Sequence, residues 1–303
     1  MAATYVNVNG VLTDAAHATI SVFDHGFLFG EGVYEVCRTY NGEPFLFDRH
    51  MQRMRASAAM IALDVPCSDD EFLRRAKETM AAAGLGRQPD GSVRDAYVRI
   101  LLTRGIGELT YDPAATPVPS VVVIVKPNVQ VPASQHANGV PIMFVDIVRN
   151  HPQSVSPLIK SNNLLNNALG MQQALKRGGV EGVFRNYRGE ISECAQSNLF
   201  IVSGGVVRTP GLEAGLLAGI TRAFVLEIAA ELGYRTEEAV LRDADLFGAD
   251  EAFLTSTTKE IVPVVRVDDR PVGTGRPGPI TQALLAEYRR KAEAMTAAPH
   301  APA

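Results

Sequence analysis

The sequence has few cysteines, no basic stripe and no long run of apolar residues. Its three cysteines, Cys37, Cys67 and Cys194, lie far apart and form no CxxC motif, so it indicates neither a disulfide framework nor a zinc site. The net charge of -4 argues against a nucleic-acid surface, because phosphate binding needs clustered Lys and Arg. The apolar runs are shorter than a bilayer span, and the N-terminus lacks a signal pattern. We therefore expect a cytoplasmic protein with no metal, membrane or nucleic-acid partner.

Length and composition favour one or two compact domains. Of the 303 residues, 46% are hydrophobic and 20% are charged, which is enough to build a sizeable core. The stretch PNVQVPASQ contains two prolines and has neither a helical nor a strand period. We predict a small N-terminal α/β domain over residues 1–126, an interdomain linker over 127–135 and a larger mixed α/β domain over 136–303.

Strands and helices alternate along the chain. TYVNVNG (4–10) and HATISVF (17–23) are typical of strands, and the first ends in the hairpin signal Asn9-Gly10. Ser68 and Glu71 form a capping-box pattern ahead of a helix that stops at Gly84. TAAPHAPA (296–303) is typical of a frayed tail. The other expected elements are strands at 95–103, 120–126, 140–148, 181–186, 198–202, 251–256 and 261–267, and helices at 49–63, 162–177, 220–233 and 280–295.

One lysine stands in an unusual place. Lys160 follows the apolar tripeptide Pro157-Leu158-Ile159 and precedes four asparagines in seven residues. An ammonium group is costly to desolvate in such a setting, which indicates an amine that does not remain a solvated cation. A lysine at a strand end whose stem covers apolar surface gives the same pattern. The lysine alone is therefore not decisive.

Three further stretches carry groups of complementary chemistry. Glu193, in GEISECAQSN, stands among small polar side chains about thirty residues after the lysine. Gly219-Ile220-Thr221 opens an amphipathic helix, where free N–H groups and the helix dipole favour a phosphate. Thr255 to Thr258 place four hydroxyls in one turn. Each also has an ordinary interpretation, as a loop carboxylate, a common helix start and a plain Ser/Thr turn.

Together these stretches meet the needs of pyridoxal phosphate, which requires a lysine for its imine, an acid at its ring nitrogen and groups that bind its phosphate. Over residues 4–290 the chain resembles the class IV, fold type IV, aminotransferases. Six blocks in the same order carry the resemblance: SVFDHGFLFGEGVYEVCR, FDRHMQRMRASA, IKSNNLLNN, GEISECAQSN, LAGITR and FLTSTTKEIVPV. It implies a two-domain fold type IV protein that uses pyridoxal 5′-phosphate.

The resemblance also implies roles for individual residues. Lys160 corresponds to the Schiff-base lysine, which also carries the proton between the substrate Cα and the cofactor. Glu193 corresponds to the partner of the ring nitrogen. The other implied cofactor contacts are Arg53, Ile220, Thr221 and Thr257 at the phosphate, Leu217 on the cofactor face, and Asn198 beside Glu193.

The substrate pocket resembles two subfamilies. Tyr97 and Arg99 fit the Tyr-x-Arg pattern of short branched-chain aminotransferases. In contrast, three places where the sequence departs from that subfamily resemble D-amino-acid aminotransferases: Tyr34-Glu35-Val36, Leu165 in place of a tyrosine, and Thr255 to Thr258. The Arg-x-His carboxylate trap of the D-specific enzymes is absent, because Leu109-Thr110-Tyr111 occupies its place. The implied substrate contacts are Tyr34, Val36, Tyr97, Arg99 and Thr258.

Two other functions share part of this sequence pattern. The aminodeoxychorismate lyases share the lysine and the glutamate, but they tend to have a threonine where Val36 stands. A dinucleotide loop at GEG (30–32) lacks its third glycine and the acidic ribose ligand. We expect a transaminase that moves an amino group between an amino acid, branched-chain or another L-monocarboxylate, and a 2-oxo acid. A D-amino-acid aminotransferase is the alternative and the lyase a second one. The resemblance implies a homodimer.

Overall fold

The computed structural model describes residues 3–297 and divides into two compact units. Unit 1 comprises Met1–Val129, Ile159–Asn163 and Ala292–Ala303, and unit 2 comprises Gln130–Leu158 and Leu164–Lys291. The change from one unit to the other after Val129 falls inside the predicted linker. That stretch is not free of secondary structure, because Pro127 ends a strand and Ala133 begins a helix. The part of the expected tail over 298–303 lies outside the described residues.

Unit 1 contains a six-stranded sheet in the order β2-β1-β8-β7-β3-β4. The hairpin signalled by Asn9-Gly10 is confirmed, because β1 and β2 pair across it. The strand predicted over 17–23 is wrong: the partner of β1 follows the turn directly, and Val22 and Phe23 are left exposed. The strands are β1 (Tyr5–Val8), β2 (Val11–Asp14), β3 (Gly32–Tyr40), β4 (Glu43–Pro44), β7 (Ala96–Thr103) and β8 (Ser120–Pro127), and a separate pair is β5 (Gly86–Arg87) with β6 (Val93–Arg94).

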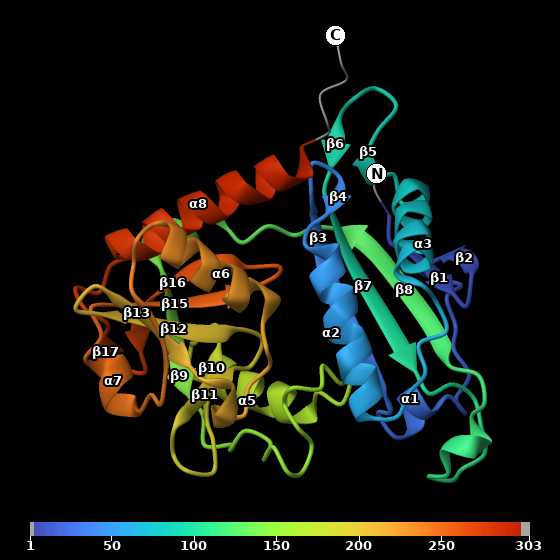
Figure 1. The fold of residues 1–303 in the computed structure, drawn as a ribbon, viewed down its shortest axis with the longest axis horizontal. Helices are drawn as coiled ribbons and strands as arrows, with labels where there is room; N and C mark the ends of the chain where they lie inside the picture. Colours follow the sequence, from blue (N-terminus) through green and yellow to red (C-terminus); the bar gives the residue numbers. More distant parts are fainter. Residues whose placement is uncertain (1–2, 298–303) are drawn as a thin grey trace. The chain divides into compact units, whose positions relative to one another are not determined.

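Two helices, α2 (Phe47–Met60) and α3 (Asp69–Ala82), cover one face of this sheet (Figure 1). Because side chains alternate along a strand, Val33, Glu35 and Cys37 of β3 point to the helix-covered face. Tyr34 and Val36 point to the other face. The cap predicted for α3 is confirmed, since Ser68 Oγ accepts a hydrogen bond from the Glu71 N–H at 3.2 Å. Unit 1 also contains α1 (His25–Leu28) and η1 (Pro113–Ala115).

Unit 2 is built on a nine-stranded mixed sheet in the order β11-β10-β9-β16-β15-β12-β13-β14, with β17 paired to β16. Its strands are β9 (Val140–Phe144), β10 (Gly182–Arg185), β11 (Ile191–Cys194), β12 (Asn198–Ser203), β13 (Val206–Pro210), β14 (Thr236–Ala239), β15 (Glu251–Ser256), β16 (Glu260–Val267) and β17 (Arg270–Pro271). Its helical segments are α4 (Ala133–Asn138), α5 (Leu165–Lys176), η2 (Leu212–Ala214), α6 (Ile220–Glu231) and α7 (Asp243–Phe247), and α8 (Pro279–Thr296) starts in it. Helices and a mixed sheet therefore occur together, as the α/β prediction required.

Helix α5 starts three residues later than predicted. Main-chain pairing with β3 explains this, because Ser161 forms a β-bridge with Val33 and the Asn162 N–H donates to the Gly32 carbonyl at 3.1 Å. Residues held in this extended pairing cannot also start a helix. Among the described residues, no helix is both long and apolar enough to cross a membrane.

A buried ion cluster joins α2 to β3 in unit 1. Arg53 donates from Nε and Nη2 to the two carboxylate oxygens of Glu35, at 2.7 and 2.8 Å, and His50 Nδ1 lies 2.7 Å from Glu35 Oε2. Burial by itself would raise the pKa of Glu35, but Arg53 and His50 outweigh burial and lower this pKa to about 2. Burial lowers the pKa of His50, against the opposing charge of Glu35. Arg53 and His50 thus favour the ionised form of Glu35, and burial favours the uncharged form of His50.

This cluster predicts a pH-dependent stability. Because the folded-state pKa of His50 lies below its ordinary value of 6.5, the unfolded chain binds the extra proton first, and stability falls as pH drops below 6.5. The expected slope from this one proton is at most about 1.4 kcal/mol per pH unit. Glu35 adds a further loss between about pH 4.5 and 2. Urea unfolding at pH 7.0, 6.0 and 5.0 measures the slope.

His50→Gln should flatten the slope between pH 6.5 and 5, because glutamine keeps a donor to Glu35 but does not titrate. His17→Gln is the matched control, since the His17 side chain is 77% exposed and its loss should leave the slope unchanged. Equal slopes in wild type and His50→Gln would show that His50 does not produce the effect.

Candidate functional site

Lys160 is fixed to unit 1 through its main chain. Its N–H donates to Ser57 Oγ at 3.1 Å, and its carbonyl accepts the Tyr34 N–H at 3.0 Å. Ser57 lies on α2 and is 1% exposed, so the lysine segment is anchored to a buried hydroxyl as well as to a strand. The apolar tripeptide before the lysine gave a signal in the sequence, but nothing in it indicated Ser57. The backbone at Lys160 is thereby held in one place.

The Lys160 ammonium group lies over an aromatic ring. Its Nζ is 4.5 Å from the centroid of the Tyr34 ring, and the guanidinium carbon of Arg99 lies 4.0 Å from the same centroid. In the sheet register Val36 is opposite Arg99, and Tyr97 lies two residues before Arg99 on the same face. The structure therefore brings together the predicted catalytic lysine and four of the five predicted substrate contacts.

Arg53 occupies a different environment from a solvated helix charge. Its side chain is 12% exposed, and two of its nitrogens bind Glu35. The sequence gave no indication of this pairing, because Glu35 is eighteen residues away and on another element. Arg53 is thus a rigidly held cation, and its orientation is set by the carboxylate behind it.

In unit 2, Glu193 is a buried carboxylate with partners on both oxygens. It is 5% exposed on β11. Arg149 Nε donates to Oε1 at 2.9 Å, and Arg149 Nη2 lies 2.9 Å from the same oxygen. The Leu217 N–H lies 3.2 Å from Oε2, and Asn198 Nδ2 lies 3.4 Å from the same oxygen. An arginine and two neutral donors therefore compensate the charge of this carboxylate and fix its orientation.

Arg149, the charged partner of Glu193, is a residue that the sequence did not single out. It is 8% exposed, and its Nη1 donates to Asn166 Oδ1 at 2.9 Å, while Asn166 Nδ2 donates to the Val148 carbonyl. A buried arginine fixed on two sides holds Glu193 in one orientation. The only signal in the sequence is a charged residue directly after an apolar run, which is too common to identify a site.

Asn198 connects Glu193 to the start of α6. Its Nδ2 also donates to the Leu217 carbonyl at 3.1 Å, and its Oδ1 lies so near Gly219 that a Cβ there would approach to 1.9 Å. Gly219 is the N-cap of α6 and has no side chain to cap the helix. Ile220 and Thr221, the first helical residues, are 7% and 5% exposed. This helix start has the geometry that suits an anion.

The predicted threonine turn joins β15 to β16. Asn198 is opposite Thr255 in the sheet, so the turn carrying Thr257 and Thr258 follows two residues after this pair. Thr255 Oγ1 is buried, and no hydrogen-bond partner for it is found within the described part of the chain. The same holds for Asn162 Oδ1 in unit 1. Both are buried polar atoms of the kind that a bound polar group satisfies.

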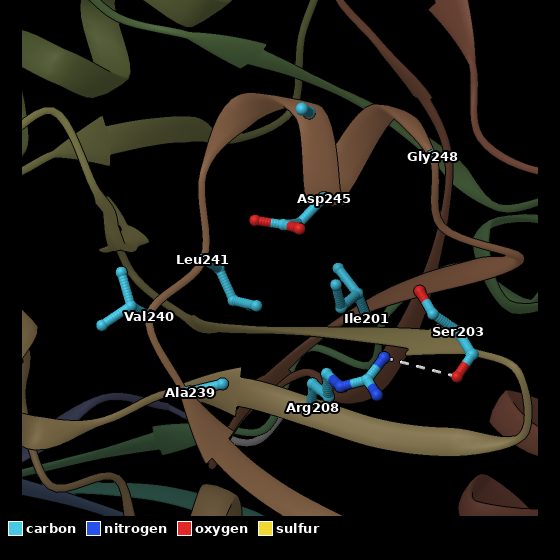
Figure 2. A pocket seen from close by; sticks show the side chains of 9 residues that line it. Ile201, Ser203, Arg208, Ala239, Val240, Leu241, Asp245 and Gly248 are labelled. Carbon is cyan, nitrogen blue, oxygen red and sulfur yellow. Dashed lines mark hydrogen bonds between the residues drawn. The ribbon is translucent and has the colours of Figure 1, made fainter.

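Two features of unit 2 take no part in the contacts described above. Leu165, at the position where the resembling branched-chain enzymes have a tyrosine, is 66% exposed at the first residue of α5. A separate hollow of about 320 Å³ lies in unit 2, and none of the predicted site residues lines it. Figure 2 shows the residues around this hollow, which are Ile201, Ser203, Arg208, Ala239, Val240, Leu241, Ala244, Asp245 and Gly248.

Comparison with known proteins identifies the family of this chain. The family model for amino-transferase class IV matches residues 32–267. A putative branched-chain-amino-acid aminotransferase of Methanocaldococcus jannaschii is 35% identical over 94% of this chain and 95% of its own length. A D-alanine aminotransferase of Bacillus licheniformis is 34% identical over 90% and 92% of the two chains.

Solved structures show the same similarity. The branched-chain amino acid aminotransferase of Escherichia coli superposes with a TM-score of 0.90, at 30% identity, over 97% of this chain and 96% of that one. Another branched-chain amino acid aminotransferase, solved with pyridoxamine 5′-phosphate, gives a TM-score of 0.89 at 26% identity over 96% and 95%. The family uses pyridoxal phosphate, and its solved members have the fold type IV architecture. This chain belongs to the class IV aminotransferase family and is an aminotransferase.

Proposed function

We propose that this aminotransferase binds pyridoxal 5′-phosphate and uses Lys160 as the amine that reacts with it. The observation that carries the proposal is the position of Lys160, whose main chain is fixed by Ser57 and Tyr34 and whose ammonium lies over the Tyr34 ring. A lysine that must give up its proton during turnover needs such a fixed, partly desolvated place.

Each unit carries groups that suit this cofactor. When bound, pyridoxal phosphate supplies a carbonyl that combines with amines and a ring that accepts electrons. In unit 2, the uncapped start of α6 at Ile220 and Thr221 and the hydroxyl of Thr257 suit a phosphate. In unit 1, the guanidinium of Arg53 is a cation that suits a phosphate. The buried hydroxyl of Thr255 and the buried side-chain carbonyl of Asn162 offer two further polar contacts.

Each residue has a defined task in this proposal. Lys160, as a free amine, would take the proton from the substrate Cα and pass it to the cofactor. Glu193, paired with Arg149, would hold the ring nitrogen of the cofactor, and Asn198 holds Glu193 in place. Leu217 excludes water from the cofactor face. The amino group is transferred in two half-reactions, the first with the amino acid and the second with the 2-oxo acid.

The open sheet face of unit 1 determines the substrate in this proposal. Tyr34, Val36 and Tyr97 offer an apolar wall with two phenol groups, and Arg99 adds a cation. Such a wall suits an aliphatic L-amino acid, with 2-oxoglutarate as acceptor. In unit 2, Thr258 is proposed as a further substrate contact. The 34% identity with D-alanine aminotransferase supports a D-amino acid as the second candidate substrate.

A homodimer is also proposed. Two segments of unit 1 are bridged between Asp24 and Ile106 and expose Phe23 at 52%, Phe27 at 65%, Leu109 at 68% and Tyr111 at 81%. An apolar surface of this kind is typical of a protein interface. Sedimentation equilibrium measures the assembly, and a monomer at micromolar concentration contradicts this part of the proposal.

Amine transfer tests the proposed function. Wild-type protein with pyridoxal phosphate should transfer the amino group of L-leucine to 2-oxoglutarate, and Lys160→Ala should lose all turnover and still fold, by circular dichroism. L- and D-alanine and D-glutamate are assayed in parallel. Pyruvate released from aminodeoxychorismate without an acceptor would identify the lyase instead, and absence of any oxo-acid-dependent transfer would contradict the proposal.

The role of Arg99 is tested by comparing substrates with one and two carboxylates. Arg99→Leu should reduce kcat/KM for L-glutamate by roughly 10- to 150-fold, because one charge-assisted contact contributes about 1.5 to 3 kcal/mol. The value for L-leucine should change much less. Lys126→Leu is the control, since Lys126 lies opposite Tyr97 on the same sheet face and is exposed. Equal losses for both substrates, or a wild type that prefers D-alanine, would reject the branched-chain assignment.

A further inference from the structure

A second buried carboxylate in unit 2 has no part in the site described above. Glu181, directly before β10, is fully buried at 0% exposure. It accepts hydrogen bonds from Ser197 Oγ at 2.9 Å and from the Gln196 N–H at 3.1 Å, and Lys259 Nζ binds the same carboxylate. Burying a carboxylate costs free energy unless it is paired and hydrogen-bonded. The partners of Glu181 must therefore stay in place around it.

The partners of Glu181 come from two different segments. Gln196 and Ser197 belong to the connection of three residues between β11, which carries Glu193, and β12, which begins at Asn198. Lys259 is the last residue of the turn that carries Thr257 and Thr258. Lys259 Nζ also lies 3.4 Å from Gln196 Oε1. One buried ion pair therefore connects the segment beside the ring-nitrogen partner to the turn proposed for the phosphate.

The turn needs this second attachment. The sheet register places Ser256 opposite Glu260, but the three residues between them are outside the ladder. Glu260 closes the turn with φ of 59°, a left-handed conformation that costs energy for a residue with a side chain. Arg289 Nε holds the Glu260 carboxylate at 2.7 Å on one side, and the pair of Lys259 with Glu181 holds the other end of the turn.

We propose that Lys259 and Glu181 are positioning residues that set the turn of Thr257 and Thr258 for the cofactor phosphate. The inference rests on the proposed function. In this inference Lys259 acts through the turn, because its ammonium binds Glu181 and lies 3.4 Å from Gln196 Oε1, in the connection between β11 and β12. We expect its effect at the phosphate end of the cofactor, because Lys259 belongs to the turn of Thr257 and Thr258.

Pyridoxal, which lacks the phosphate, separates the two ends experimentally. The dissociation constants of pyridoxal phosphate and of pyridoxal are measured by absorbance titration of cofactor-depleted full-length protein. The variant is Glu181→Gln with Lys259→Met, which removes the ion pair without leaving a buried charge and keeps an acceptor for Ser197. We expect its dissociation constant for pyridoxal phosphate to rise at least tenfold and its value for pyridoxal to stay within twofold of wild type.

Two further variants sharpen the result. Lys259→Arg keeps the cation and should retain at least half of the wild-type affinity for pyridoxal phosphate. The control pair is Arg208→Met with Glu237→Gln, because this ion pair (2.7 Å) joins β13 to β14 beside the hollow of Figure 2. This control removes an ion pair from the same unit and should leave both dissociation constants unchanged.

The outcomes distinguish the inference from the function on which it rests. A wild type that binds neither compound overturns the proposed function and the inference with it. A wild type that binds pyridoxal phosphate, with the ratio of the two dissociation constants unchanged in the double variant, overturns the inference alone. This includes the case in which both compounds bind equally more weakly, because that result shows a general loss of structure. A change confined to pyridoxal phosphate supports it.

Discussion

The main-chain hydrogen bonds between residues 159–163 and β3 are the constraint on which the rest of the account depends. They place Lys160 in unit 1 although the residues on either side of this segment belong to unit 2. The Tyr34 N–H, the Gly32 carbonyl and the Val33 bridge fix three successive residues of the segment. Because backbone pairing does not depend on side-chain rotamers, the main chain that carries the lysine side chain is fixed. Tyr34 then presents both its N–H and its ring to the same residue.

Buried carboxylates organise the groups around this lysine and in unit 2. Glu35 orients Arg53, Arg149 orients Glu193, and Glu181 binds the turn of Thr257 through Lys259. Each pair costs desolvation energy, and breaking one member leaves an uncompensated charge, so such pairs fix geometry more than they add stability. Such pairs suit a site in which proton positions matter, because the partners of each buried carboxylate are held at fixed distances.

Local patterns predicted the parts of the fold that depend on local chemistry. The β-rich runs at 95–103 and 120–126 predicted β7 and β8, and Ser68 predicted the start of α3, because composition and capping are properties of adjacent residues. The strand expected over 17–23 is wrong because β1 pairs with Val11–Asp14 across the turn and with β8 on its other edge. The late start of α5 has a long-range cause, since pairing with β3 removed its first residues from the helix.

The candidate site divides in the same way. The sequence indicated Lys160, Glu193 and the threonine turn from their neighbours, and resemblance added Arg53 and Arg99. Nothing local indicated Arg149, Ser57 or the pairing of Glu181 with Lys259, because each joins elements that are distant in the sequence. Partners of buried charges are defined only when the sheet and its connections are assembled.

The most direct test of the central claim is to identify the lysine that reacts with the cofactor. Holoenzyme is reduced with borohydride, digested and mapped by mass spectrometry, which locates the residue that retains the cofactor. The account predicts a single label on Lys160, with Lys126 and Lys259 unlabelled. A label on another lysine, with Lys160 unmodified in protein that binds pyridoxal phosphate, would contradict it.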